Sequence, residues 1–188
     1  MAFKILTLND ETFAEHCKRL LQKATDDGFE PDLTVSIPRG GDVMAEIACS
    51  KDKHRNIILI RKAKGGKIKR LFKPLFSKMP RGLNDRFRKL EARYLMHRNN
   101  HMEHVEIVLP DECKTARRIL IIDDAVDTGA TLKAVFDKIK HSNSGADVRM
   151  AVITITSVKP LIMPDYYIYN NRTLVRFPWS IDYKKMKQ

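Results

Sequence analysis

Apolar and polar residues follow each other in blocks, and these blocks predict strands that alternate with helices. Short apolar runs typical of buried parallel strands occur at 33–37, 56–61, 118–122 and 148–156, with a further short strand expected at 166–169. Helical spacing of apolar residues occurs at 13–21, 43–49 and 130–140, with Asn9 or Asp10 capping the first helix and Asp42 opening the second. Alternating strands and helices favour an α/β fold, with a parallel sheet flanked by helices.

The most specific pattern is the stretch 119–132, which reads I-L-I-I-D-D-A-V-D-T-G-A-T-L. An apolar strand ends in Asp123 and Asp124, and a short Thr/Gly loop then opens a helix. Ligands of open α/β sheets bind at the carboxyl ends of the strands. The N–H groups at a helix start favour a phosphate, whereas carboxylates suit hydroxyl groups or a metal ion. The pattern predicts a sugar-phosphate site; the alternative is an acidic strand end of the kind found in response regulators.

This string closely resembles the motif with which type I phosphoribosyltransferases bind 5-phosphoribosyl 1-pyrophosphate (PRPP). The resemblance implies a Rossmann-like type I fold in which Asp123 and Asp124 hold the ribose hydroxyls and a Mg²⁺ ion, directly or through water. It implies that the following loop binds the 5′-phosphate through Ala125, Asp127, Thr128, Gly129, Ala130 and Thr131. Asp127 matches the acid that contacts the acceptor base in purine enzymes, so we expect it to be the general base. Capping the next helix is its alternative role.

A second motif, S-I-P-R-G-G-D, occupies positions 36–42 at the end of the first strand. Two glycines allow the backbone to approach a ligand closely, although the motif alone fits a simple turn. The resemblance implies a pyrophosphate-binding loop made by Pro38, Arg39, Gly40 and Gly41. It also implies a cis peptide between Pro38 and Arg39, as is often found in that loop of the family.

The segment 159–183 resembles the C-terminal hood of the purine enzymes. Lys159 matches the lysine that reaches the purine oxygen. The acceptor-binding set implied by the resemblance is Lys159, Leu174, Val175, Trp179 and Asp182. Leu174 stands where such enzymes place a stacking aromatic residue, and this departure weakens the purine interpretation unless Phe177 or Trp179 takes that role. An aromatic face stabilises a stacked base by roughly 1–3 kcal/mol.

The segment 62–104 holds most of the positive charge. Residues 61–104 contain fourteen Lys and Arg against three Asp and Glu, so they carry eleven of the net charge of +12. Leu83 and Leu90 belong to one of two apolar stripes at helical spacing, which predicts a basic helical insertion. Basic amphipathic helices favour an anionic membrane surface, contacted through 67–98; a helical lid or a homodimer interface is the alternative.

No nucleic-acid-binding motif accompanies this charge, so we expect no specific nucleic-acid partner. His97, His101 and His104 share one helix face, where zinc is less favoured than a solvated surface. The length of 188 residues predicts a single domain, 1–188. The three cysteines are scattered, and the sequence has neither a signal pattern nor a run of about 18 apolar residues. We therefore expect a cytoplasmic protein, which could also bind peripherally to the inner face of the membrane.

The resemblance implies an enzyme, a glycosyltransferase of the pentosyl type that moves 5-phosphoribosyl from PRPP to an acceptor and releases pyrophosphate. The basic insertion slightly favours a hydroxyl group of a membrane-linked glycan, so that ribofuranose is added during polysaccharide assembly. The alternative is a purine salvage enzyme that uses hypoxanthine, guanine or xanthine. A non-catalytic regulator that senses PRPP is the third hypothesis.

Overall fold

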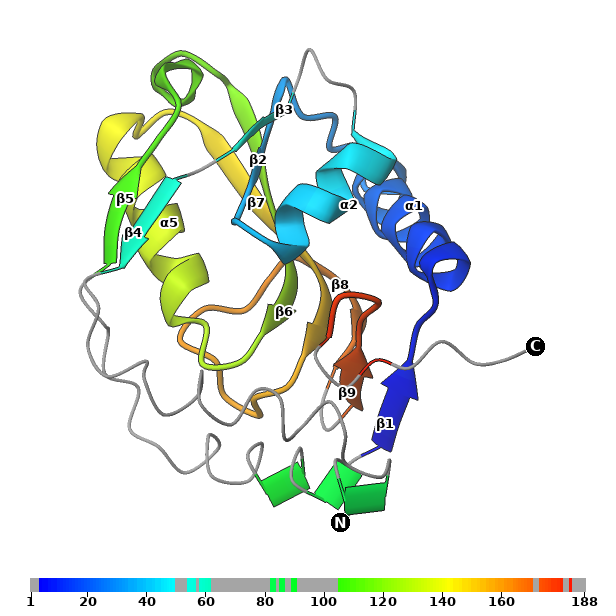
Figure 1. Ribbon diagram of the computed structural model, residues 1–188. Helices are drawn as coiled ribbons and strands as arrows, with labels where there is room; N and C mark the ends of the chain where they lie inside the picture. Colours follow the sequence, from blue (N-terminus) through cyan, green and yellow to red (C-terminus); the bar gives the residue numbers. More distant parts are fainter. Residues whose placement is uncertain are drawn as a thin grey trace.

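A five-stranded parallel sheet forms the centre of the molecule (Figure 1). The computed structural model describes residues 4–49, 54–56, 58–61, 82–83, 85–86, 89–90, 105–170, 173–180 and 183. The strands lie in the order β3-β2-β6-β7-β8, and every neighbouring pair is parallel. Their bounds are β3 His54–Asn56, β2 Leu33–Ser36, β6 Arg118–Val126, β7 Asp147–Ile155 and β8 Tyr166–Tyr169. The predicted α/β class is therefore confirmed.

Helices cover both faces of this sheet. The helices α1 (Asp10–Asp26) and α2 (Gly40–Ala48) lie on one face, and α5 (Ala130–Ser142) lies on the other (Figure 1). Asn9 caps α1, since its side chain accepts from the Thr12 amide at 2.8 Å and Thr12 accepts from the Asn9 amide at 3.0 Å. Reciprocal bonds of this kind satisfy two amides that the first helical turn leaves without partners.

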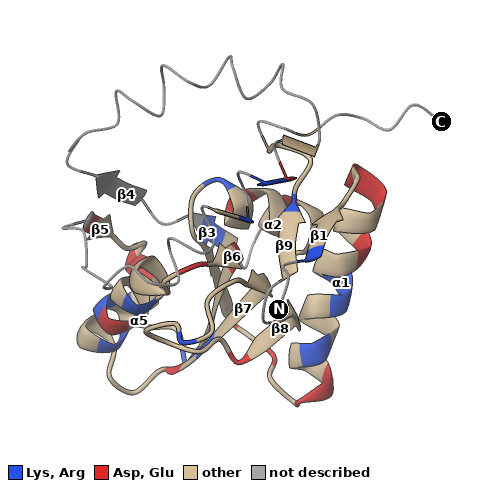
Figure 2. Cartoon of the chain, turned by 90° about the horizontal axis from the view of Figure 1, so that it is seen from below, with Lys and Arg blue, Asp and Glu red and all other residues tan. Residues whose placement is uncertain are grey.

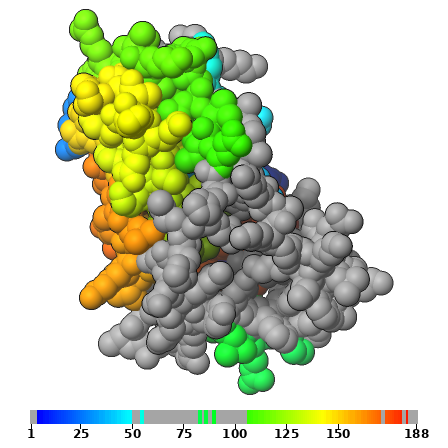
Figure 3. Space-filling model, turned by 90° about the vertical axis from the view of Figure 1, so that its left-hand side faces the viewer, coloured from blue at the N-terminus to red at the C-terminus, as the bar shows by residue number. Residues whose placement is uncertain are grey.

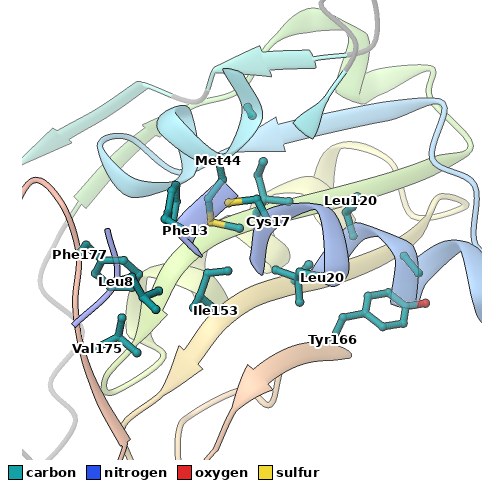
Figure 4. Packing of buried hydrophobic residues seen from close by; sticks show 14 of the residues in the cluster. Leu8, Phe13, Cys17, Leu20, Met44, Leu120, Ile153, Tyr166, Val175 and Phe177 are labelled. Carbon is teal, nitrogen blue, oxygen red and sulfur yellow. The ribbon is translucent and has the colours of Figure 1, made fainter. Parts of the chain in front are cut away.

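The alternation of side chains along β6 divides the core into two layers. Leu120 and Ile122 face α1 and α2, where they pack with Phe13, Met44 and Ile153 (Figure 4). Ile119 and Ile121 face α5, where they pack with Leu132, Val135 and Ile139. Successive residues of a strand point to opposite faces, so a strand buried on both sides is apolar throughout. The apolar run that precedes Asp123 thus follows from its central place in the sheet.

A small parallel pair, β1 (Lys4–Thr7) and β9 (Thr173–Arg176), lies beside the main sheet at its β7 side. It joins the N-terminal strand to the C-terminal hood, and Leu174 is opposite Ile5 in the pair. Phe177, just after β9, packs edge-on against Phe13 of α1 with ring centroids 5.9 Å apart. The hood is therefore part of the same hydrophobic core, and its partner β1 was not predicted from the sequence.

The strand expected at 56–61 is divided between two sheets. Residues 54–56 form the edge strand β3, whereas β4 (Ile58–Arg61) pairs antiparallel with β5 (Val105–Val108). The prediction of one core strand there was wrong, because an apolar run shows that a strand is buried and not which strand it pairs with. Next along the chain, the 3-10 helix η2 (Asp111–Lys114) and β5 lie against α5 on one face of the molecule (Figure 3).

The basic insertion lies mostly outside the described residues. Positions 82–83, 85–86 and 89–90 are helical, in agreement with a helix in this segment, and Leu83 and Leu90 are 47% and 58% exposed. Elsewhere, α1 and α5 carry acidic and basic residues interspersed along their surfaces (Figure 2). His97, His101 and His104, which the sequence analysis weighed as zinc ligands, are outside the described residues. None of the helices in the described part is both long and apolar enough to cross a membrane.

Candidate active site

Asp123 and Asp124 lie at the carboxyl end of β6, the central strand of the sheet. Alternation along the strand places Asp123 on the side of α5 and Asp124 on the side of α2. The Asp124 amide donates to the Asp123 carboxylate at 2.8 Å, so the two acids are held close together. Both side chains are half-buried, and water reaches each of them only in part. The pair is therefore presented at the edge where a parallel sheet binds its ligands.

Burial raises the pKa of both carboxyl groups. For Asp123 the shift is large, and the neighbouring charge of Asp124 adds to the effect of burial in raising this pKa. Two adjacent ionised carboxylates that water reaches only in part raise the free energy of the folded state, unless a cation neutralises them or hydroxyl groups donate hydrogen bonds to them. Their oxygens are ligands that Mg²⁺ accepts, so the donor set suits a magnesium ion together with ribose hydroxyls.

The predicted pyrophosphate loop lies directly against Asp124. A Cβ atom added to Gly40 would come within 2.1 Å of the Asp124 Cγ, and one added to Gly41 within 2.5 Å of the Ile122 carbonyl oxygen. Only glycine allows so close an approach between the loop and β6. The two motifs that the sequence placed on separate strands are thus in contact at one edge of the sheet.

Arg39 has a backbone conformation that residues with a side chain rarely adopt, with φ 84° and ψ −90°. Such conformations cost about 1–3 kcal/mol and are concentrated at functional turns. The peptide bond between Pro38 and Arg39 is trans, as are the other peptide bonds of the described segments. The expected cis peptide was therefore wrong; the turn into α2 is made by the positive φ of Arg39 instead.

The helix that follows begins earlier than the sequence predicted. α2 starts at Gly40, so Asp42 lies in its first turn rather than before it. There the Asp42 carboxylate accepts from the Arg39 amide at 3.2 Å and from the Ser36 hydroxyl at 2.6 Å. His54 Nε2 lies 3.0 Å from the same hydroxyl. This network behind the loop was not predicted, because it joins residues 18 positions apart.

The predicted phosphate loop connects β6 to α5. Gly129 precedes the helix with φ 77°, and the Ala130 amide donates to Thr128 Oγ1 at 3.3 Å. A Cβ atom on Gly129 would lie 3.1 Å from the Leu161 amide nitrogen, and that amide donates to the Thr128 carbonyl at 2.9 Å. The loop is thus fixed between the start of α5 and the segment that carries Lys159 and Pro160.

Asp127 is exposed, and its carboxylate accepts from the Thr156 hydroxyl at 2.5 Å. Thr156 follows the last residue of β7, so the strand next to β6 holds this acid. Thr128, and not Asp127, accepts the first amide of α5, that of Ala130, so the structure does not show the expected capping role of Asp127. Thr156 is at the end of the strand predicted at 148–156, but only the folded structure shows its contact with Asp127.

The predicted acceptor residues lie in different surroundings. Lys159 is exposed in the loop after β7, and the next residue, Pro160, lies against Gly129 of the phosphate loop. Leu174 and Val175 are buried in the β1–β9 pair, with 8% and 6% exposed, so their side chains offer little surface to an acceptor. Trp179 is 38% exposed and stacks on Phe177, with centroids 5.0 Å apart. Asp182 is outside the described residues.

Comparison with known proteins identifies the fold. No protein-family model matches the sequence, and no curated protein matches it. Among solved structures, the xanthine-guanine-hypoxanthine phosphoribosyltransferase of Helicobacter pylori matches with a TM-score of 0.63, at 15% identity over 95% of each chain. The purine phosphoribosyltransferase of Pyrococcus horikoshii matches with a TM-score of 0.55, at 18% identity over 98% of this chain and 99% of that one.

A third structure, a hypothetical protein of Neisseria gonorrhoeae with bound ppGpp, has a TM-score of 0.56, at 13% identity over 95% of this chain and 90% of its own. The parallel sheet and the flanking helices are those of the type I phosphoribosyltransferase fold. The fold expected from the motif at 119–132 is confirmed.

Proposed function

We propose that the protein is a PRPP-dependent phosphoribosyltransferase whose acceptor is a purine base. One observation carries the donor half of this proposal: the Arg39-Gly40-Gly41 loop lies against Asp124 at the carboxyl edge of the sheet. The amides of Gly40 and Gly41, which open α2 beside two carboxylates, match a ligand that has both phosphates and hydroxyl groups. PRPP has both, with its pyrophosphate next to the ribose hydroxyls.

The purine acceptor is supported by structures of the same fold that act on purines, as their names state. The exposed Lys159, which precedes the Pro160 that lies against the phosphate loop, is available to a purine oxygen. The glycan hydroxyl that the charged insertion favoured gains no support from the described residues, since that segment is largely outside them. Membrane contact is likewise without support.

In the proposed reaction the bond from ribose C1 to pyrophosphate breaks, and a bond from C1 to a purine nitrogen forms. The amides of Gly40 and Gly41 orient the leaving pyrophosphate, and the 127–131 loop fixes the 5′-phosphate. Asp127 accepts the proton that the purine nitrogen loses, and Thr156 keeps one carboxylate oxygen in place. A Mg²⁺ ion held by Asp123 and Asp124 would supply positive charge to the pyrophosphate oxygens.

The test is a set of reactions with PRPP, magnesium and hypoxanthine, guanine, xanthine or adenine, in which nucleotide and pyrophosphate are measured. We expect nucleotide formation by the wild type, and no PRPP binding by the double variant Asp123→Asn, Asp124→Asn. The matched control is Asp137→Asn, which changes an exposed acid that pairs with Lys133 on α5 at 2.6 Å. It should leave both binding and turnover unchanged.

Other outcomes separate the alternatives. PRPP binding with no nucleotide from any purine would contradict the purine acceptor. If pyrophosphate were then released only with a lipid-linked glycan, the acceptor would be a hydroxyl group. PRPP binding without pyrophosphate release under any condition would indicate a regulator. Unchanged PRPP affinity in the double variant would contradict the whole assignment.

A further inference from the structure

The loop at 38–41 is held by a residue to which no role has been assigned. Asp42, in the first turn of α2, accepts the Arg39 amide on Oδ2 and the Ser36 hydroxyl on Oδ1. Oδ2 therefore binds the loop through Arg39, and Oδ1 binds the end of β2 through Ser36. Both bonds have an ionised acceptor, and such bonds are stronger than those between neutral groups. Asp42 thus links the strand to the loop across the turn that leads into α2.

The direction of the hydrogen bonds in this network can be assigned. An ionised carboxylate only accepts, so the single hydroxyl hydrogen of Ser36 goes to Asp42. His54 Nε2, 3.0 Å from the same oxygen, must then carry the hydrogen that it donates to Ser36. A nucleophilic serine would instead give its hydrogen to the histidine. Because Ser36 is also fully buried, this group of three residues is not a catalytic triad.

The network binds the backbone at the residue with the least favourable conformation, Arg39. Arg39 is the described non-glycine residue with positive φ, and its amide is the one that Asp42 binds. The next residue, Gly40, has no room to move toward β6, because the Asp124 side chain lies against its Cα. A change in the conformation of Arg39 would therefore shift the loop against Asp124.

From these contacts we infer that Asp42 is a positioning residue, which with Ser36 and His54 holds the 38–41 loop in the conformation that binds the pyrophosphate of PRPP. The inference rests on the proposed function, since that function makes this loop the pyrophosphate site. Asp42 acts through the Arg39 backbone and need not touch the substrate. Its role is to accept hydrogen bonds, and its negative charge is not itself required.

Two substitutions separate hydrogen bonding from charge. Asp42→Ala removes both acceptors. Asp42→Asn keeps an oxygen for the Arg39 amide, while its NH₂ group donates to Ser36, whose hydroxyl hydrogen then turns away from residue 42. Isothermal titration with magnesium pyrophosphate and with PRPP measures the effect. We expect affinity to fall about tenfold or more in Asp42→Ala, because the Arg39 amide is left without its acceptor, and only a few-fold at most in Asp42→Asn, which keeps one.

Asp32 provides a matched control at the opposite end of the same sheet. Its carboxylate also accepts two backbone amides, those of Arg117 and Arg118, each at 3.0 Å. Asp32→Ala should lower the melting temperature yet leave pyrophosphate affinity unchanged, which separates general destabilisation from a specific effect on the loop. Melting temperatures of all variants, read without ligand, show whether each one is folded.

The inference is overturned if folded Asp42→Ala binds pyrophosphate as the wild type does. It is also overturned if Asp42→Asn is as impaired as Asp42→Ala, since charge would then be the requirement. A steady-state readout adds to these outcomes: the KM for PRPP should rise in Asp42→Ala more than kcat falls. A wild type that binds neither PRPP nor pyrophosphate would instead refute the proposed function, and this inference with it.

Discussion

At the scale of single residues, Thr156 and Asp127 form the contact that most directly concerns the proposed chemistry. The Thr156 hydroxyl donates to one oxygen of the Asp127 carboxylate, and it lies 3.3 Å from the Val126 carbonyl oxygen. One carboxylate oxygen is thus restrained, and the other remains to accept a proton. A general base must be within hydrogen-bond reach of the proton that it removes, so its orientation affects the rate.

Thr156→Val should therefore lower kcat by about tenfold, while the KM for PRPP changes little. Valine has nearly the same shape as threonine but lacks the hydroxyl group. Thr156→Ser keeps the hydroxyl group and should restore most of the rate, which a purely structural role of the methyl group would not allow. Steady-state kinetics of the three proteins measure this, and equal kcat in Thr156→Val and wild type would contradict the role.

Three free cysteines allow a second test at this scale. Burial raises the pKa of Cys17 to about 12 and that of Cys113 to about 11, from an ordinary value of 9.0. Because only the thiolate reacts with alkylating agents, neither residue should be labelled in the folded protein at pH 8. Half-buried Cys49 should react first. Mass spectrometry after iodoacetamide treatment, with and without denaturant, measures the order of labelling.

The raised pKa of Cys17 determines whether this residue adds or removes stability as the pH rises. The folded state keeps the Cys17 proton up to about pH 12, whereas the unfolded chain loses it near pH 9.0. The contribution of this group to stability is thus complete below pH 9.0 and is lost as the pH rises toward 12. Cys17→Ala should lose less stability than the wild type over that range in denaturant titrations.

At the scale of elements, the position of α1 depends on its first turn. Asn9 and Thr12 exchange hydrogen bonds, and the face of the helix that carries Phe13 and Leu20 packs on the sheet. The sequence predicted this cap, because a polar residue before an amphipathic run is typical of a helix start. It did not predict the end of the helix, which extends to Asp26.

Asn9→Ala should reduce the free energy of unfolding by about 1 kcal/mol, because the Thr12 amide loses its acceptor. For a domain of this size the melting temperature should fall by about 2–4 °C. Asn9→Ser keeps a capping oxygen and should cost less. Thermal unfolding followed by circular dichroism measures the difference, and equal melting temperatures of Asn9→Ala and wild type would show that the cap contributes nothing.

The elements that the sequence missed are those whose partners are distant along the chain. β1 is four residues long and pairs with β9 at the other end of the protein. The split between β3 and β4 likewise depends on which neighbour each strand meets. Local patterns indicate burial and periodicity, and strand pairing is decided by contacts between distant residues.

At the scale of the whole molecule, a buried cation connects the hood to the basic insertion. Arg176 of β9 is 6% exposed; it donates to Asp85 at 2.5 Å and to Thr7 Oγ1 at 3.0 Å. Asp85 is one of only three acids among residues 61–104. The ion pair joins the hood to Asp85 of the insertion, and the hydrogen bond to Thr7 joins the hood to β1.

Asp85→Ala should weaken the attachment of the insertion and should make trypsin cleave within 62–104 several-fold faster, since that segment is rich in Lys and Arg. Loss of a partner for a buried charge is more costly than loss of a surface pair. Asp137→Ala, which breaks an exposed pair on α5, is the control. Fragments identified by mass spectrometry give the sites, and equal cleavage rates in Asp85→Ala and wild type would contradict the attachment.

The sequence by itself determined the fold class and the main features of the proposed donor site. An apolar strand that ends in two acids, followed by a loop and a helix, requires only residues that are adjacent along the chain, so the pattern is local. The tertiary structure decided the rest: the contact between Gly40 and Asp124, the Asp42 network, the Thr156 bond to Asp127 and the burial of Leu174. Each of these depends on which strands are neighbours and which faces meet, and those relations arise only when the chain folds.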